Sequence, residues 1–325
     1  MGNKREFKFE VQHLPNKVVS GGPRPARART ASAELSPLGQ QKRGTIPVEG
    51  NTERIYAVEL FYESPPDFTK SGLCTSLARR FPHIKPLSED SSDLLAFVHE
   101  DCMVQYKGGA LPAQLLVVPG QREGDSVSIE PALEQSWLFP DAREAVSIAK
   151  HTVLVNDIMA QGLPYRERLD RFLGALEAIL TDYPCRAIHW RQSQQVMSCE
   201  QFLSSMKDPQ QHTLNGGPLN GRFFNVSNGQ IEGECLVDTM GLAVFGLPDI
   251  QCHFHGLDVD SVIHQILNVA IYLFDNGDLI EDGNTVPGLQ SGEKWTCQHE
   301  DSLAPPNRVV LDLNPGAQWA AGKRA

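Results

Sequence analysis

Short apolar runs between turn signals fill the first half of the chain and predict a series of strands. The predicted strands are Ile55–Tyr62, Leu94–His99, Leu115–Val118 and His151–Asp157. Helices are predicted from Pro65 to Phe81 and over Asp141–Lys150. The resulting β-α-β-β-α-β order is that of a ferredoxin-like split unit.

The pattern partly repeats in the second half. The helix with the clearest apolar stripe is predicted over Pro164–Tyr183, where apolar residues recur at three- and four-residue spacing. A strand at Cys185–Trp190 follows, and then a helix that Ser198 caps and that runs through Met206. Phe223–Val226 and Cys235–Asp238 are predicted to be extended.

These elements predict an α+β fold. No Ser/Gly-rich linker separates residues 51–160 from residues 161–325. We therefore expect two ferredoxin-like, split βαβ halves with these bounds. Together they would form one extended mixed or antiparallel sheet, with the helices mainly on one face.

The stretch from Gly241 to Asp301 contains most of the candidate chemistry. Leu242–Phe245 and Ile250–His255 are both predicted to be extended. Because side chains alternate along a strand, His253 and His255 should share one face with Gln251. The cysteine and phenylalanine between them should lie on the opposite face.

A long amphipathic helix is predicted next. Asp258 is a good N-cap, apolar residues recur at helical spacing up to about Asn276, and Gly277 is a natural stop. An acidic turn then carries Asp278 and Asp282, before a polar strand-like segment that includes Trp295 and ends on three ionisable residues. These three are His299, Glu300 and Asp301.

Residues 1–50 are rich in Pro, Gly, Arg, Ala and Ser and predict a disordered basic arm. The segment Phe7–Val11 alternates and could pair with a sheet edge. The arm holds nine Lys or Arg and four Glu, a net charge of +5, so the remaining residues carry −16 of the total of −11. A body this acidic repels phosphate backbones, which disfavours nucleic-acid binding.

The cysteines and the termini point to a compartment. The seven cysteines include no CxxC motif and mostly lie in apolar text, which favours free buried thiols in a reducing cytoplasm. The amino terminus lacks the apolar segment of a signal peptide. No apolar stretch approaches the roughly 20 residues needed to span a bilayer.

Two histidines on one strand face, His253 and His255, suit a divalent transition metal such as zinc, iron or manganese. A third ligand could come from Asp258, Asp282 or His299. The alternative is that the two histidines form the polar face of a half-covered strand.

The remaining polar groups have structural alternatives too. The acidic turn could bind a hard cation, or it could be held by its own side-chain-to-backbone bonds, since it lacks EF-hand spacing. His299 and Glu300 are adjacent on a strand and should face opposite ways, which disfavours a shared catalytic pocket.

Several phrases resemble a known family. LPDIQCHFHGLD, NVAIYLFDNGDLIEDGNTV, KWTCQHED and VVLDLNPG are similar to the bacterial family known as domain of unknown function 4261. WLFPDAREAV, HTVLVNDIMA and CRAIHW are similar to its longer members. The resemblance covers roughly Ile55 to Gly316 and implies a soluble bacterial protein, sometimes encoded near secretion or toxin-defence genes. It transfers no catalytic residue.

The leading hypothesis is a non-catalytic, cytoplasmic protein that binds another protein, in an immunity-like or secretion-accessory role, without a cofactor. The alternative is a metal-dependent hydrolase that uses His253, His255, Asp282 and His299. A third possibility is that the basic arm docks on the acidic body. In the leading hypothesis the carboxy-terminal third is a packed scaffold whose ionisable groups face outward.

Overall fold

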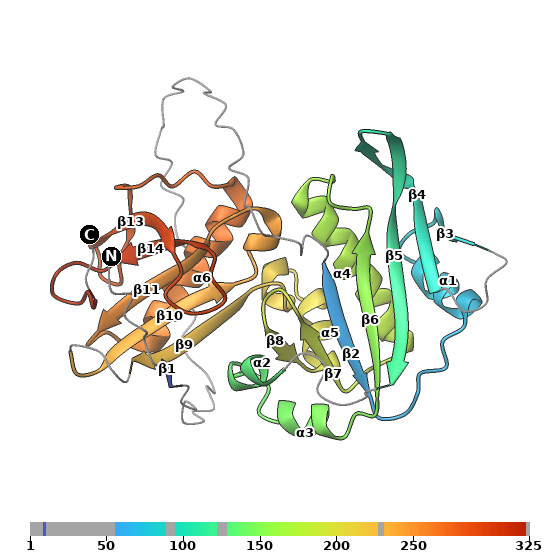
Figure 1. The fold of residues 1–325 in the computed structure, drawn as a ribbon, viewed down its shortest axis with the longest axis horizontal. Helices are drawn as coiled ribbons and strands as arrows, with labels where there is room; N and C mark the ends of the chain where they lie inside the picture. The colour runs from blue at the N-terminus through green and yellow to red at the C-terminus, as the bar shows by residue number, and fades with distance from the viewer. Residues whose placement is uncertain (1–8, 11–55, 89–94, 122–128, 227–230, 323–325) are drawn as a thin grey trace, which may run out of the picture.

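The computed structural model describes residues 9–10, 56–88, 95–121, 129–226 and 231–322. The described strands form two sheets of seven strands each, with the helices lying against them (Figure 1). This arrangement confirms the α+β class. It differs from the expectation in that the strands divide between two sheets instead of sharing one. Apart from Phe9–Glu10, the predicted disordered arm lies outside the described residues.

The amino-terminal sheet has the order β3-β4-β5-β6-β2-β7-β8, and every neighbouring pair is antiparallel. Its strands are β2 (Ala57–Tyr62), β3 (Ile84–Pro86), β4 (Leu95–Tyr106), β5 (Gly109–Gln121), β6 (His151–Ile158), β7 (Ala187–Trp190) and β8 (Gln195–Met197). Its helices are α1 (Lys70–Ala78), α2 (Glu130–Glu134), α3 (Ala142–Ser147), α4 (Tyr165–Asp182) and α5 (Cys199–Lys207).

A ferredoxin-like unit does occur in this sheet, but it ends later than expected. The parallel strands β6 and β7 are joined by α4 and separated by β2, which is the split βαβ arrangement. The second helix of the unit is therefore α4 and not α3, because α2 and α3 pack with Phe61, Ala187 and Val196 on the other face. The chain leaves this sheet after Met197, whereas the predicted halves meet at residue 160.

The carboxy-terminal sheet has the order β1-β9-β10-β11-β14-β13-β12. Its strands are β1 (Phe9–Glu10), β9 (Asn220–Val226), β10 (Glu234–Met240), β11 (Asp249–His255), β12 (Thr285–Pro287), β13 (Lys294–Asp301) and β14 (Val309–Asn314). Adjacent β11 and β14 are parallel, so this half departs from the ferredoxin-like order. The parallel pair forms because a long connection through α6, β12 and β13 separates the two strands.

Helix α6 (Val259–Asn276) covers one face of the carboxy-terminal sheet. The Asp258 carboxylate accepts from the backbone N–H of Ser261 at 2.9 Å, as the N-cap prediction requires. The apolar stripe of α6 packs on Ile250, Cys252 and Phe254 of β11. Just before β11, residues 243–245 form a short 3-10 helix, η2 (Ala243–Phe245), instead of the predicted extended run.

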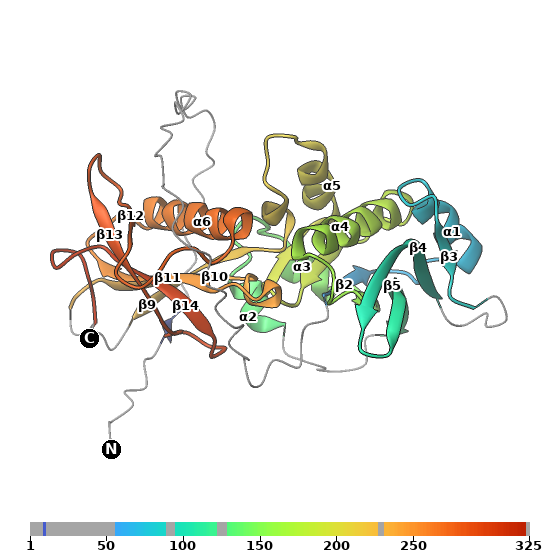
Figure 2. The same ribbon diagram turned by 90° about the horizontal axis from the view of Figure 1, so that it is seen from above.

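One continuous core joins the two halves. The Tyr165 hydroxyl donates to the carbonyl oxygen of Phe274 at 2.6 Å, and Tyr56 stacks on Phe245 with ring centroids 5.6 Å apart. Phe245 in turn contacts Phe274 at 5.3 Å. Figure 2 shows α4 and α6 on the same side of the two sheets. In the part of the chain that the structure describes, no helix has the length and apolar character needed to cross a lipid bilayer.

Candidate functional site

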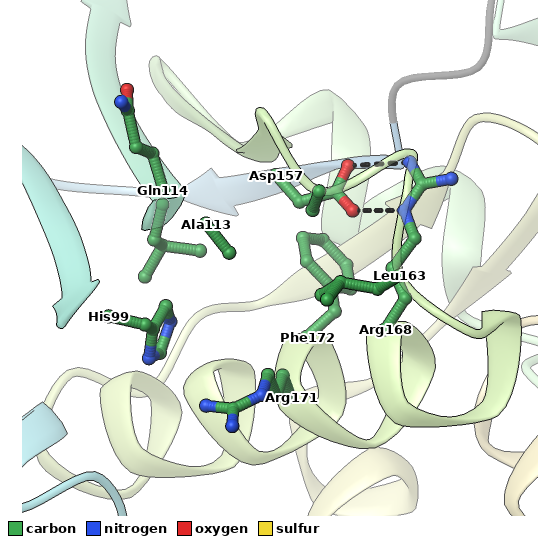
Figure 3. Close-up of a pocket in the computed structure, with 10 residues that line it drawn as sticks. His99, Ala113, Gln114, Asp157, Leu163, Arg168, Arg171 and Phe172 are labelled. Atoms are coloured by element: carbon green, nitrogen blue, oxygen red, sulfur yellow. Dashed lines mark hydrogen bonds and ion pairs between the residues drawn. The ribbon is translucent and has the colours of Figure 1, made fainter. Parts of the chain in front are cut away.

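A small cavity lies between the β4–β5 hairpin and α4, and Figure 3 shows the residues around it. Its volume is about 20 Å³. A cavity of this size holds one water molecule and no larger ligand. The polar side chains at its wall are His99, Gln114, Asp157, Arg168 and Arg171.

His99 is the unusual group in this wall. Its side chain is 4% exposed, and its Nδ1 atom has no hydrogen-bond partner among the described residues. Burial, together with the positive charge of Arg171, lowers the pKa of His99 to about 4. The imidazole is therefore neutral at pH 7, and its ring lies nearly perpendicular to that of Phe81, with the ring centroids 4.7 Å apart. A neutral, buried histidine next to a single-water cavity can orient one water molecule.

Asp157 and Arg168 form a buried ion pair beside the cavity (Figure 3). Both carboxylate oxygens accept from the guanidinium, one of them from Nη2 at 2.8 Å. The same carboxylate accepts from the backbone N–H of Tyr56 at 2.7 Å. The pair thus fixes the end of β6 against α4, and its two charges neutralise each other.

An open groove of about 470 Å³ lies beside the cavity and shares Arg171 with it. Arg171 lies 3.6 Å from Asp101 and 3.3 Å from Glu167, measured between the guanidinium nitrogens and the carboxylate oxygens. Burial raises the pKa of the nearby Asp170 above its ordinary value. The charges of this groove are largely paired with one another, so it presents no strong field of one sign.

The two predicted strand histidines do share one face of β11. The carboxy-terminal sheet places His253 opposite Leu236. Cys252 and Phe254, the residues on either side of His253, pack under α6. The alternation predicted for this strand is therefore confirmed. The His253 Nε2 atom lies 3.3 Å from a carboxylate oxygen of Glu234, and both side chains are buried.

His299 and Asp282 come together elsewhere. The Nδ1 atom of His299 lies 2.8 Å from the Asp282 carboxylate, and its Nε2 atom lies 3.3 Å from that of Asp278. The Asp282 carboxylate also accepts from the backbone N–H of His299 at 2.8 Å. His299 thus fastens the turn after α6 to β13, which is a structural use of the acidic turn.

Strand register separates the two pairs. His299 lies opposite Leu311, which lies opposite Ile250. Residues directly opposite in a sheet project on the same face, so His299 is on the α6 face. His253 alternates with Ile250 and projects on the other face. The four predicted ligands therefore do not form one site, and no group of three or more His, Cys, Asp or Glu within the described ranges is placed to hold a metal ion.

The face of the carboxy-terminal sheet opposite α6 carries a charge cluster that the sequence interpretation missed. Asp238 is fully buried and accepts from Arg222 through Nε at 2.8 Å and through Nη2 at 2.6 Å. Arg308 donates to Asp238 through Nη2 at 2.6 Å and to Asp249 through Nε at 3.1 Å. We call these four residues the buried charge cluster.

The buried charge cluster is electrically balanced, with two guanidinium groups and two carboxylates. Burial raises the pKa of Asp249, while the charge of Arg308 opposes that shift. Arg308 also donates to the carbonyl oxygens of Ala304 and Pro306, and therefore holds the segment before β14 on the sheet. Because its donors and acceptors are used internally, the cluster acts as a clamp. This finding corrects the expectation that the ionisable groups of this region face outward.

The sequence did contain a trace of this cluster. Arg222 directly precedes the aromatic pair Phe223-Phe224, and Asp238 ends an apolar run. Neither position follows the alternation expected of a strand with a solvated face. Charged residues at such positions indicate buried pairing.

The comparisons with known proteins match only a part of the chain. No curated protein and no solved structure gives a significant match to the chain. Residues 238–314 match the family model described as "Domain of unknown function (DUF4261)". The match begins at Asp238 and ends with β14, which is a shorter span than the resemblance from Ile55 to Gly316. The region from Asp238 to Asn314, which contains β11, α6, β12, β13 and β14, is therefore similar to the DUF4261 family.

Proposed function

We propose that this protein acts by binding another protein, through the far end of the β4–β5 hairpin. The observation that carries the proposal is a group of exposed apolar side chains on this hairpin. Met103, Tyr106 and Leu111 are 49%, 37% and 45% exposed. Figure 1 shows the far end of the hairpin extending beyond α4. Exposed apolar groups gathered on one feature are typical of interaction sites.

The hairpin presents apolar groups on both faces. Val104 pairs with Leu111, and Tyr106 pairs with Gly109 at the turn, so Tyr106 and Leu111 share a face with Val104. Met103 pairs with Pro112 and projects on the opposite face. A partner for this element would need an apolar groove that receives both faces.

The base of the hairpin is anchored, which favours binding without a large ordering cost. Cys102, Val104 and Ala113 pack with Ala160 in a separate small apolar cluster. Val104 is 1% exposed although Tyr106, two residues away, is well exposed. A preorganised element loses less conformational entropy on association than a loose loop does.

We also propose a setting for this function. All seven cysteines are free thiols, which suits a reducing cytoplasm. The acidic body suits a protein partner better than a nucleic acid. A bacterial immunity-like or secretion-accessory role would need binding of this kind and no cofactor.

Affinity purification from the native cell tests the proposal, with Met103→Glu/Leu111→Glu as the hairpin variant. Leu138→Glu is the matched control, because Leu138 is 79% exposed and outside the hairpin. We expect a stoichiometric partner with the natural protein and the control, and its loss with the hairpin variant. Retention of the partner by the hairpin variant, or no stoichiometric partner under any condition, would refute the proposal.

A further inference from the structure

The outer edge of β9 is bonded by two segments that come from far away in the sequence. The side-chain amide of Gln135 accepts from the backbone N–H of Phe223 at 3.1 Å and donates to the carbonyl oxygen of the same residue at 3.1 Å. Further along the edge, the two-residue strand β1 pairs antiparallel with Val226 and Asn225.

Gln135 bonds this edge as a neighbouring strand would. It is 3% exposed and follows α2, so its amide is held in place by the amino-terminal half of the molecule. In an antiparallel ladder, alternate residues direct both backbone groups to the same neighbour. Phe223 directs both groups to Gln135, away from β10. Asn225 has the same parity and therefore directs its N–H and C=O to the same side, where β1 lies.

The length of β9 distinguishes this edge from the others. Strands β3, β8 and β12, which form the remaining edges of the two sheets, have three residues each. Strand β9 has seven residues: Gln135 bonds Phe223, and among the described residues β1 pairs with Asn225 and Val226. Long edges with free backbone groups attract further strands, and proteins usually cover them.

We propose that the outer edge of β9 is a strand-binding site for an extended polypeptide. Phe9 and Glu10 of this chain occupy part of it in cis, and a separate peptide strand can replace them. An incoming strand would add to the sheet by backbone pairing, the mode called β-augmentation. The occupant residue opposite Val226 should be apolar, because Val226 and Phe224 belong to an apolar cluster with Leu236 and Ala304.

Between the described residues, the cis pairing consists of Phe9 with Val226 and Glu10 with Asn225. By the parity of the edge, Glu10 and Asn225 form the pair in which each residue donates to the other. A proline at position 10 removes one of these donors, since proline has no backbone N–H.

The test uses the full-length protein and a fluorescein-labelled peptide of residues 5–14, REFKFEVQHL, with binding followed by fluorescence anisotropy. In the Glu10→Pro protein the backbone pairing of Phe9–Glu10 with β9 is weakened. We expect this protein to bind the peptide roughly tenfold more tightly than the natural protein does, as expected for one or two backbone hydrogen bonds. Val18→Pro is the matched protein control and should bind like the natural protein.

A second experiment keeps the Glu10→Pro protein and changes the peptide instead. A peptide with Glu10→Pro should bind the Glu10→Pro protein at least about tenfold more weakly than the natural peptide does. The proposal is overturned if the Glu10→Pro protein binds the natural peptide no more tightly than the natural protein does. Equal binding of the two peptides would also overturn it. Neither arm involves the hairpin or its partner, so the outcome is independent of the proposed function.

Discussion

Replacing Asp238 by alanine removes the carboxylate at the centre of the buried charge cluster. Asp238 is fully buried and accepts from two guanidinium groups, so the variant leaves Arg222 and Arg308 without their shared counter-charge. The side chains of these arginines are only 4% and 7% exposed, which prevents water from replacing the carboxylate. Breaking a buried ion pair by removing one partner costs about 3–5 kcal/mol. We expect a loss in the free energy of unfolding of about 4 kcal/mol.

Urea denaturation followed by tryptophan fluorescence measures this loss. Glu100→Ala is the control, because Glu100 pairs with Lys85 at 2.8 Å while both side chains are about half exposed. Exposed pairs contribute about 0–1 kcal/mol, so the control should change little. Asp238→Asn keeps the side-chain volume and should lose an intermediate amount. If Asp238→Ala cost no more than Glu100→Ala, the cluster would not be the clamp described above.

Two further predictions concern titration and metal. The pKa of His99 is lowered to about 4 in the fold, so the unfolded chain takes up this proton first as the pH falls. The stability due to neutral His99 is present above pH 6.5 and should fall by about 3 kcal/mol by pH 4. Urea titrations at several pH values should show this loss in the natural protein but not in His99→Phe, and equal losses in the two proteins would contradict the assigned burial. A metal that binds the folded protein, at a free concentration of about 100 times its Kd, would stabilise the fold by about 2.7 kcal/mol. Because His253 and His299 lie on opposite faces, we expect zinc, iron(II) and manganese to leave the melting temperature unchanged, and a shift abolished by both His253→Ala and His299→Ala would show that a common site exists.

Local signals predicted the elements that depend on neighbouring residues. The cap at Asp258, the apolar stripe of α6 and the end near Gly277 all follow from contacts within one helix. The opposite faces of His253 and Cys252 follow from the period of a strand. These features were predictable because each requires information from fewer than about 20 consecutive residues.

Other features depend on contacts that are remote in sequence. Asp238 and Arg308 are 70 residues apart, so no local pattern links them. The apolar run at residues 242–245 suits a strand and a 3-10 turn equally well, and the hydrogen bond from the backbone N–H of Leu242 to Asp249 favours the turn. The predicted halves meet at residue 160, whereas the amino-terminal sheet also includes β7 and β8, which pair with strands that are remote in sequence or follow α4.

The buried charge cluster lies only partly within the DUF4261 match, because Arg222 precedes the matched residues. The matched residues start at Asp238, yet Arg222 and the whole of β9 precede that point. A recombinant piece cut at residues 238–314 would lack β9 and the first four residues of β10, and Asp238 would lose its ion pair with Arg222. Any excised version intended for biophysical work should begin upstream of Asn220, so that the sheet is isolated with its counter-ions in place.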